Sequence, residues 1–227
     1  MSGRCCSASL YIIMGTDIHG VFQRHDSTTG NWEDIPSKFD ENRHYQLFAV
    51  LAGVRNGTGF AGVKTGEPVK PIAKPRGLPE GFEVDEGDAH PIASIDLIAE
   101  WQRKYRREGD PLNVWMGDHS HSWLTADEML AWFERAPVVV HTGILDRDVY
   151  EKWDHKTAPA GYCGGIFGPG VVLINDNQLE RDSTPNWTHI HCEWDAPLKQ
   201  ELAYFFNEVA RLQAEYGQVR FVFGFDS

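Results

Sequence analysis

The last 33 residues of the chain limit the choice of fold more than any other part. Asp195 and Pro197 are typical of a helix start, and apolar residues then recur at helical spacing until Gly217. Residues 218–225 alternate apolar and polar side chains, as a strand with one buried face does. A long amphipathic helix followed by such a strand predicts helices packed on a sheet. The expected core residues are Leu198, Leu202, Phe205, Phe206, Val209 and Leu212 in the helix and Val219, Phe221, Phe223 and Phe225 in the strand.

Shorter segments supply the other elements of the fold. Apolar spacing predicts helices over residues 43–54, 92–107, 126–135 and 146–153. Alternation or short apolar runs predict strands over residues 14–23, 32–35, 138–141, 171–175 and 187–194. We therefore expect an α+β fold, in which a mixed or antiparallel sheet is packed against about four helices.

Residues 55–91 form the longest stretch without a helical or strand pattern. Gly and Pro recur throughout it, and loops of this length in compact domains are usually functional lids or disordered insertions. We expect residues 14–227 to be a single α+β domain that carries this loop. Residues 1–13 are expected to be a flexible leader or an extension from an upstream start codon.

Composition narrows the classes of partner. The formal net charge of the 227 residues is −12, which disfavours non-specific binding to nucleic acid or to an anionic membrane. Four cysteines without a disulfide pattern indicate a reducing, cytoplasmic compartment. No apolar run is as long as a membrane-spanning helix requires.

The first part of the long loop has the opposite charge to the rest of the chain. Residues 55–77 carry five Lys or Arg and one Glu, a local charge of +4. Basic side chains and backbone N–H groups in a glycine-rich loop can bind phosphate. The side chains expected to bind such a ligand are Arg55, Lys64, Lys74 and Arg76. A solvated loop whose charges only keep it soluble predicts the same composition.

Residues 117–125 (GDHSHSWLT) hold the densest run of reactive side chains. His119 and His121 share a face only if the backbone is extended. Thr125 and Glu128 have the spacing of a capping box, so a helix should begin directly after Thr125, and helix N-termini attract anions. Two imidazoles and Asp118 beside such a terminus favour a metal and phosphate site. Loop histidines bonded to backbone are the alternative explanation.

Two other segments carry possible metal ligands. Asp17 and His19 would share one face of the first strand. His189, His191 and Glu193 would line one face of a later strand, and two His with a carboxylate commonly bind zinc, manganese or non-haem iron. Polar, solvent-facing strands are the alternative explanation for both patterns. His141, at the end of another predicted strand, either joins such a site or is an ordinary core histidine.

Three motifs together resemble a family of uncharacterised proteins from bacteriophages and bacterial genomes. They are Met14-Gly15-Thr16-Asp17-Ile18-His19, Pro75-Arg76-Gly77-Leu78-Pro79 and residues 117–125. The resemblance covers roughly residues 14–135, and in that family the first motif is typically the N-terminus, which supports Met14 as the natural start. It implies an accessory phage-type protein of the host cytoplasm and no particular activity. The residues to which it directs attention are Asp17, His19, Arg76, Asp118, His119 and His121.

These patterns favour a metal-dependent hydrolase of a phosphorylated small molecule or nucleotide. Asp17, His19, His119 and His121 would bind a divalent zinc, manganese or iron ion that polarises a phosphoryl oxygen and activates water. Arg76 would neutralise charge in the transition state. Without a metal, His119 or His121 would act as general base. His189, His191 and Glu193 would either join the metal set or form a separate site.

A protein without catalytic activity is the alternative. Such a protein would sequester a nucleotide with the same basic loop, or would inhibit a host protein, and an acidic mimic of nucleic acid also agrees with the charge of −12.

Overall fold

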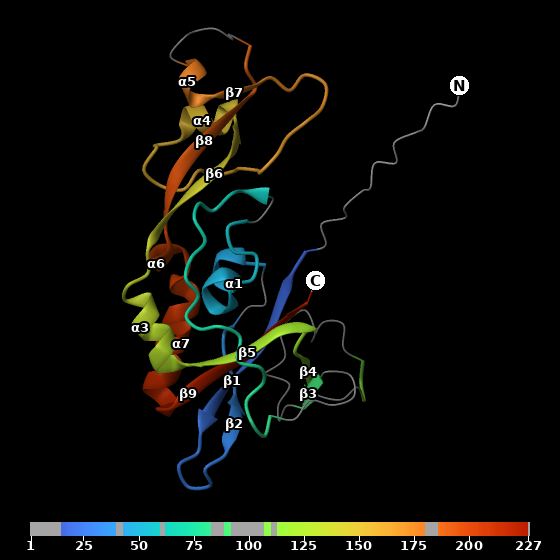
Figure 1. The fold of residues 1–227 in the computed structure, drawn as a ribbon, viewed down its shortest axis with the longest axis vertical. Coiled ribbons are helices and arrows are strands. Elements are labelled where there is room, and N and C mark those ends of the chain that lie inside the picture. Colours follow the sequence, from blue (N-terminus) through green and yellow to red (C-terminus); the bar gives the residue numbers. More distant parts are fainter. Residues whose placement is uncertain are drawn as a thin grey trace, which may run out of the picture.

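The computed structural model describes residues 15–39, 43–59, 62–82, 89–91, 107–109, 113–179 and 186–226. They form two main sheets and a set of helices packed against them, which confirms the expected α+β class (Figure 1). The helix predicted over residues 92–107 lies almost wholly outside the described residues.

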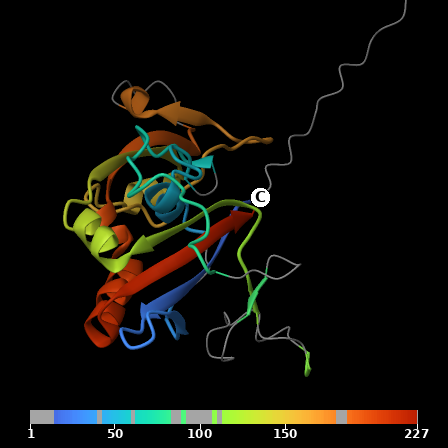
Figure 2. The same cartoon turned by 60° about the horizontal axis from the view of Figure 1, so that its bottom comes forward.

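The first sheet, sheet A, has the closing strand of the chain near its centre. It contains β1 (Asp17–His25), β2 (Trp32–Ile35), β5 (His119–Thr125) and β9 (Val219–Asp226) in the order β2-β1-β9-β5, with every neighbouring pair antiparallel. Because β1 and β5 are both antiparallel to β9, both strands begin where β9 ends. Figures 1 and 2 both show the start of β5 beside the end of the chain marked C.

The main hydrophobic core lies on one face of sheet A. It is covered by α1 (Tyr45–Ala52), α3 (Ala126–Phe133) and α7 (Ala203–Tyr216). The predicted alternation of the last strand is confirmed, because alternate residues of β9 belong to this core. The largest fully buried side chains include Phe22, Phe48, Phe205, Phe206, Phe221, Phe223 and Phe225.

The long helix predicted from residue 195 to residue 216 is interrupted. Strand β8 (His189–Pro197) continues through Asp195, so the helical backbone starts later, with α6 (Leu198–Glu201). Leu202 then has φ −98° and ψ 5°, and α7 begins at Ala203. The strand continues because pairing with β6 (Val138–Asp146) extends to Pro197, and this tertiary contact overrides the local helix-start signal.

The predicted capping box at the start of α3 is confirmed. The backbone N–H of Glu128 donates to Thr125 Oγ1 at 3.3 Å, and the backbone N–H of Thr125 donates to Glu128 Oε2 at 3.0 Å. Two backbone donors that the helix itself leaves unpaired are satisfied in this way.

Replacement of Thr125 by alanine is expected to destabilise the fold by about 1 kcal/mol, since one backbone donor loses its acceptor. The unfolding midpoint in urea measures the loss. Thr58→Ala, at an exposed threonine of the long loop, is the control and should unfold like the wild type. Equal stability of the two variants would contradict a stabilising role for the cap.

The second sheet, sheet B, consists of β6, β8 and β7 (Leu173–Asn175) in the order β6-β8-β7. β6 and β8 are antiparallel, and β7 and β8 are parallel. The short helices α4 (Arg147–Lys152) and α5 (Asp176–Leu179) follow β6 and β7 and lie with them at the top of Figure 1. A second core under this sheet contains Trp187, Ile190 and Trp194.

The long loop packs on both sheets. Lys64 pairs with Thr142 at the free edge of β6, and the backbone N–H of Gly77 donates to His121 O on β5. Further along the chain, β3 (Ala89–Pro91) and β4 (Asn113–Trp115) form an antiparallel pair. Within the described ranges, no helix combines the length and apolar character needed to cross a bilayer.

Candidate functional site

Three strand ends of sheet A bring separate candidate residues to one place. The register pairs Asp17 with Asp226, His19 with Gly224 and His119 with Phe225. Only β9 separates β1 from β5, so backbones of these two strands are about 10 Å apart at this level. The segment that contains Asp17 and His19 and the segment that contains His119 and His121 therefore meet at the same end of sheet A.

His19 and Asp226 form a pair at the centre of this end. His19 is 5% exposed, its ring packs on Trp115 with 4.8 Å between centroids, and His19 Nε2 lies 3.3 Å from Asp226 Oδ2. A carboxylate only accepts, so Nε2 carries the proton and donates to Asp226. Asp226 Oδ1 also accepts from the backbone N–H of Asp17 at 3.0 Å. Asp226 thereby fixes the orientation of the imidazole.

Asp17 lies beside this pair and binds an arginine. Its two carboxylate oxygens accept from Nε and Nη2 of Arg43, which precedes α1. This hydrogen-bonded guanidinium is the main cause that lowers the pKa of Asp17 below its usual value. Half of the Arg43 side chain is exposed, so a positive charge stands at the surface of this strand end.

His121 lies against Gly224 on the same face of sheet A as His19. A Cβ on Gly224 would stand 2.6 Å from His121 Cδ2 and 2.0 Å from the carbonyl oxygen of Met116. Gly224 is paired with His19, so a Cβ there would project to the face on which His19 lies. His121 Nε2 lies 3.0 Å from Gly117 O, and a carbonyl only accepts, so Nε2 donates and the neutral ring keeps its lone pair on Nδ1.

His119 does not lie on the same face of the sheet as His121, although both residues belong to β5. The β5–β9 register shifts between His119 and Ser122, and Ser120 has φ 53°. A bulge adds one residue to the strand and so breaks the alternation of side chains. The ring of His119 stacks on Phe225, a residue of the main core, at 6.0 Å. Asp118 is exposed and bonds to Phe225 through its backbone.

Arg76 is held away from this strand end. Its guanidinium donates to both carboxylate oxygens of Glu128, at 2.5 and 3.1 Å, and lies over the Trp123 ring at 5.0 Å. The hydrogen bond from Arg76 is the main cause that lowers the pKa of the Glu128 carboxyl. Arg76 therefore links the loop to the start of α3, and the structure gives it a structural partner in place of the expected ligand.

The other basic residues of the loop do not gather around one point. Arg55 donates from Nε to Thr16 Oγ1 at 2.8 Å and lies over Tyr45, whereas Lys64 pairs with the edge of sheet B. Lys74 is exposed. The expected phosphate-binding role of Arg55, Lys64 and Lys74 is thus not supported by a shared location, and it stays a sequence prediction.

The third predicted segment lies in the other sheet. As expected, Ile190, Cys192 and Trp194 are buried, while His189, His191 and Glu193 lie on the more exposed face of β8. His189 Nδ1 is 2.9 Å from Thr188 Oγ1, and Glu193 accepts from Thr142 Oγ1 at 3.3 Å. These three residues are in sheet B, so they do not join the residues at the end of sheet A.

His141 is a core histidine. It is 2% exposed, its Nε2 lies 3.1 Å from Gln46 Nε2, and its ring meets Trp194 edge-on at 5.6 Å. The amide nitrogen donates, so Nε2 of His141 accepts and the ring is neutral. Burial lowers the pKa of His141 and also that of His44, and each would oppose a charge on the other.

Stability should fall as the pH drops below about 6.5, the usual pKa of histidine. The pKa values of His44 and His141 are lower in the folded chain, so the unfolded chain binds protons first and stability is lost as pH falls towards the folded values. Burial raises the pKa of the Glu201 carboxyl, so this group binds its proton more tightly in the folded chain. Above about pH 4.5 it therefore adds stability as the pH falls, which opposes the effect of the two histidines. Urea midpoints between pH 8 and 5 measure the slope. His44→Gln should flatten it, and a flat wild-type profile would contradict the prediction.

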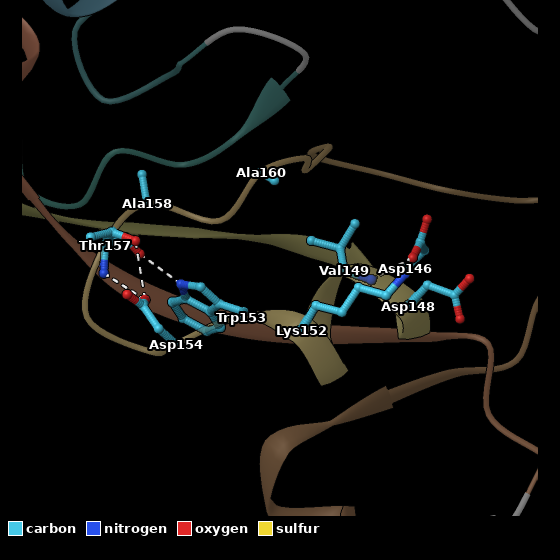
Figure 3. A pocket seen from close by; sticks show the side chains of 9 residues that line it. All are labelled: Asp146, Asp148, Val149, Lys152, Trp153, Asp154, Thr157, Ala158 and Ala160. Atoms are coloured by element: carbon cyan, nitrogen blue, oxygen red, sulfur yellow. Dashed lines mark hydrogen bonds between the residues drawn. The ribbon is translucent and has the colours of Figure 1, made fainter.

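A cavity of about 400 Å³ lies at α4 and the loop after it. Figure 3 shows Asp146, Asp148 and Lys152 at one end and Trp153, Asp154 and Thr157 at the other. The polar groups of the second end bind one another, because Trp153 Nε1 donates to Thr157 O and Asp154 accepts from Thr157. None of the residues predicted as functional lines this cavity.

A group of metal-binding side chains, or similarity to a known protein, would each be further evidence for a function. Among the described residues, no three or more His, Cys, Asp or Glu are grouped so that they could hold a metal ion. Searches of protein-family models, curated proteins and solved structures find no match to this chain.

Sequence reasoning missed several residues of the candidate site. Asp226, Gly224, Trp115 and Arg43 reach it through strand pairing or packing between distant segments. Asp226 gave one signal, since it is a carboxylate at the end of the closing strand, but nothing local indicated its partner.

Proposed function

We propose that the end of sheet A is the reaction centre of a hydrolase that acts on a phosphorylated small molecule. The observation that carries the proposal is the convergence of the His19–Asp226 pair, His121 and Arg43 from four separate segments of the chain. Oriented imidazoles support proton transfer, and an exposed guanidinium supports the binding of phosphoryl oxygens.

His121 is the proposed general base. The bond from Nε2 to Gly117 O directs the lone pair to Nδ1, which would accept a proton from the attacking water. Arg43 Nη1, which takes no part in the hydrogen bonds to Asp17, would donate to the phosphoryl group and stabilise charge that develops there. The His19–Asp226 pair lies on the same face of sheet A as His121, and the Asp226 carboxylate would hold negative charge at this end of the sheet.

The proposed reaction does not require a divalent zinc, manganese or iron ion, but the experiments test whether one is bound. The donor types at this end suit such an ion. However, Asp17 is bound by Arg43 and His19 by Asp226, so an ion would have to displace these partners. The proposed step therefore uses no metal. Elemental analysis of the wild type and of a His119→Ala/His121→Ala double variant tests for one.

Turnover of phosphomonoesters, phosphodiesters and nucleotides, each with and without divalent metal, tests the function. His121→Gln is expected to lower kcat by about 100-fold or more with little change in KM, since a general base contributes 10²–10⁴. His25→Gln, at the other end of β1, is the matched control and should retain activity. Absence of turnover by the wild type on every ester would reject the hydrolase and favour the sequestering protein.

A further inference from the structure

A second cavity lies on the same sheet, at the opposite end from His19. It has a volume of about 760 Å³, which is within the usual range for small-molecule sites. The β1–β2 hairpin forms one side, and residues 80–82 of the long loop form the other. Arg220 lies four residues before Gly224 on β9, so this cavity is about 13 Å from the candidate reaction centre along the strand.

The floor of the cavity is a buried arginine. Arg220 is 6% exposed, and in the described part of the chain its one hydrogen bond runs from Nε to Gln23 Oε1 at 2.9 Å. Among those residues no carboxylate forms an ion pair with it. Burial lowers the pKa of Arg220 to about 10, against the opposing effect of Asp34, so the side chain is still a cation at neutral pH. Its Nη groups are not sealed off by the fold, so they can donate to an acceptor that enters the cavity.

Aromatic rings flank this arginine. The guanidinium lies 4.1 Å from the centroid of Trp32 and 6.0 Å from that of Trp123. Phe82 also lines the cavity. Trp32 and Phe82 thus offer ring surface inside the cavity beside the guanidinium, against which a planar ligand can stack.

The rim of the cavity is acidic. Asp34, which accepts from Gln23 Nε2 at 2.8 Å, Glu33 and Glu80 are lining residues, and Glu33 is already paired with Arg24. Carboxylates repel a phosphate or another multiply charged anion, but they accept hydrogen bonds from N–H groups. The ligand therefore needs hydrogen-bond acceptors on the edge that faces Arg220 and donors on the edge that faces the carboxylates of the rim. The part of the ligand that enters the cavity should carry no net negative charge.

We propose that this cavity binds a purine base of the guanine type, with its carbonyl acceptor towards Arg220 and its N1–H and exocyclic amino group towards Asp34 and Glu80. Guanine presents O6 and N7 as acceptors, with which an arginine can form two hydrogen bonds. Adenine has an amino group in place of O6, and this donor would face the donors of Arg220. The inference goes beyond the proposed hydrolase and does not depend on it.

Calorimetric titration of the full chain with guanosine, adenosine and inorganic phosphate tests the proposal. Guanosine is expected to bind at least tenfold more tightly than adenosine, and phosphate is not expected to compete with it. Arg220→Gln should weaken guanosine binding at least tenfold. Arg135→Gln, an exposed arginine that donates to Ala131 O at the end of α3, is the control and should bind as the wild type does.

Asp34→Asn keeps the experiment decisive if Arg220→Gln does not fold, because the side-chain carbonyl of an asparagine at this position can still accept from Gln23. This variant should also weaken guanosine binding by about tenfold. The proposal is overturned if guanosine does not bind to the wild type, if adenosine binds equally well, or if phosphate displaces guanosine. It is also overturned if the folded variants at positions 34 and 220 bind guanosine like the wild type.

Discussion

Replacement of Gly224 by alanine should destabilise the protein by about 3 kcal/mol and displace His121 in the molecules that remain folded. A Cβ at this position would lie 2.0 Å from Met116 O, 2.6 Å from His121 Cδ2 and 3.2 Å from His121 Nε2. The carbonyl belongs to the backbone and cannot rotate away as a side chain can, so β9 and the segment before β5 would have to separate.

Thermal and urea unfolding measure the loss of stability, and the assay for phosphoester turnover measures the loss of the His121 geometry. Gly165→Ala is the matched control, since a Cβ there meets no atom within 4 Å and its φ is not in the left-handed region. A Gly224→Ala protein as stable and as active as the control would show that the close approach of the His121 ring is not required.

The Phe221→Ala variant is expected to lose about 3–5 kcal/mol of stability, the range for removal of a buried phenylalanine. Phe221 is fully buried in β9, and its ring lies 4.6 Å from Phe22, 4.9 Å from Phe39 and 5.4 Å from Phe205. These residues come from both sides of the main core, so the cavity cannot close by a small shift of one element.

The urea midpoint of Phe221→Ala should therefore be much lower than that of the wild type, whereas Phe167→Ala should leave it unchanged. Phe167 is 94% exposed and serves as a control of identical chemistry. A loss below about 1 kcal/mol at Phe221 would mean that the core between sheet A and α7 is not packed as described.

Local patterns in the sequence were sufficient for most of the secondary structure. Periodicity and capping predicted α1, α3, β2 and β9, because each depends on residues within one turn or one strand. The exception was the helix expected from Asp195, where pairing of β8 with β6 extends the strand. The pairs that extend the strand, from Asp195 to Pro197, join residues more than fifty positions apart, and no local signal contains them.

The residues of the candidate site likewise fall into those that the sequence indicated and those that only the structure revealed. The sequence by itself singled out Asp17, His19 and His121, since reactive side chains at short spacing are visible without a structure. The strand order β1-β9-β5 brought them together and added Asp226, which no spacing rule could reach across about two hundred residues.

Only the tertiary structure decided which expected partners stay apart. A bulge in β5 turns His119 to the core, Glu128 holds Arg76, and a separate sheet holds His191. The sequence determined the residue types and the local backbone, because these follow from side-chain chemistry and periodicity. Register, sheet order and ion pairing depend on contacts between distant segments, and they determined which of those residues can act together.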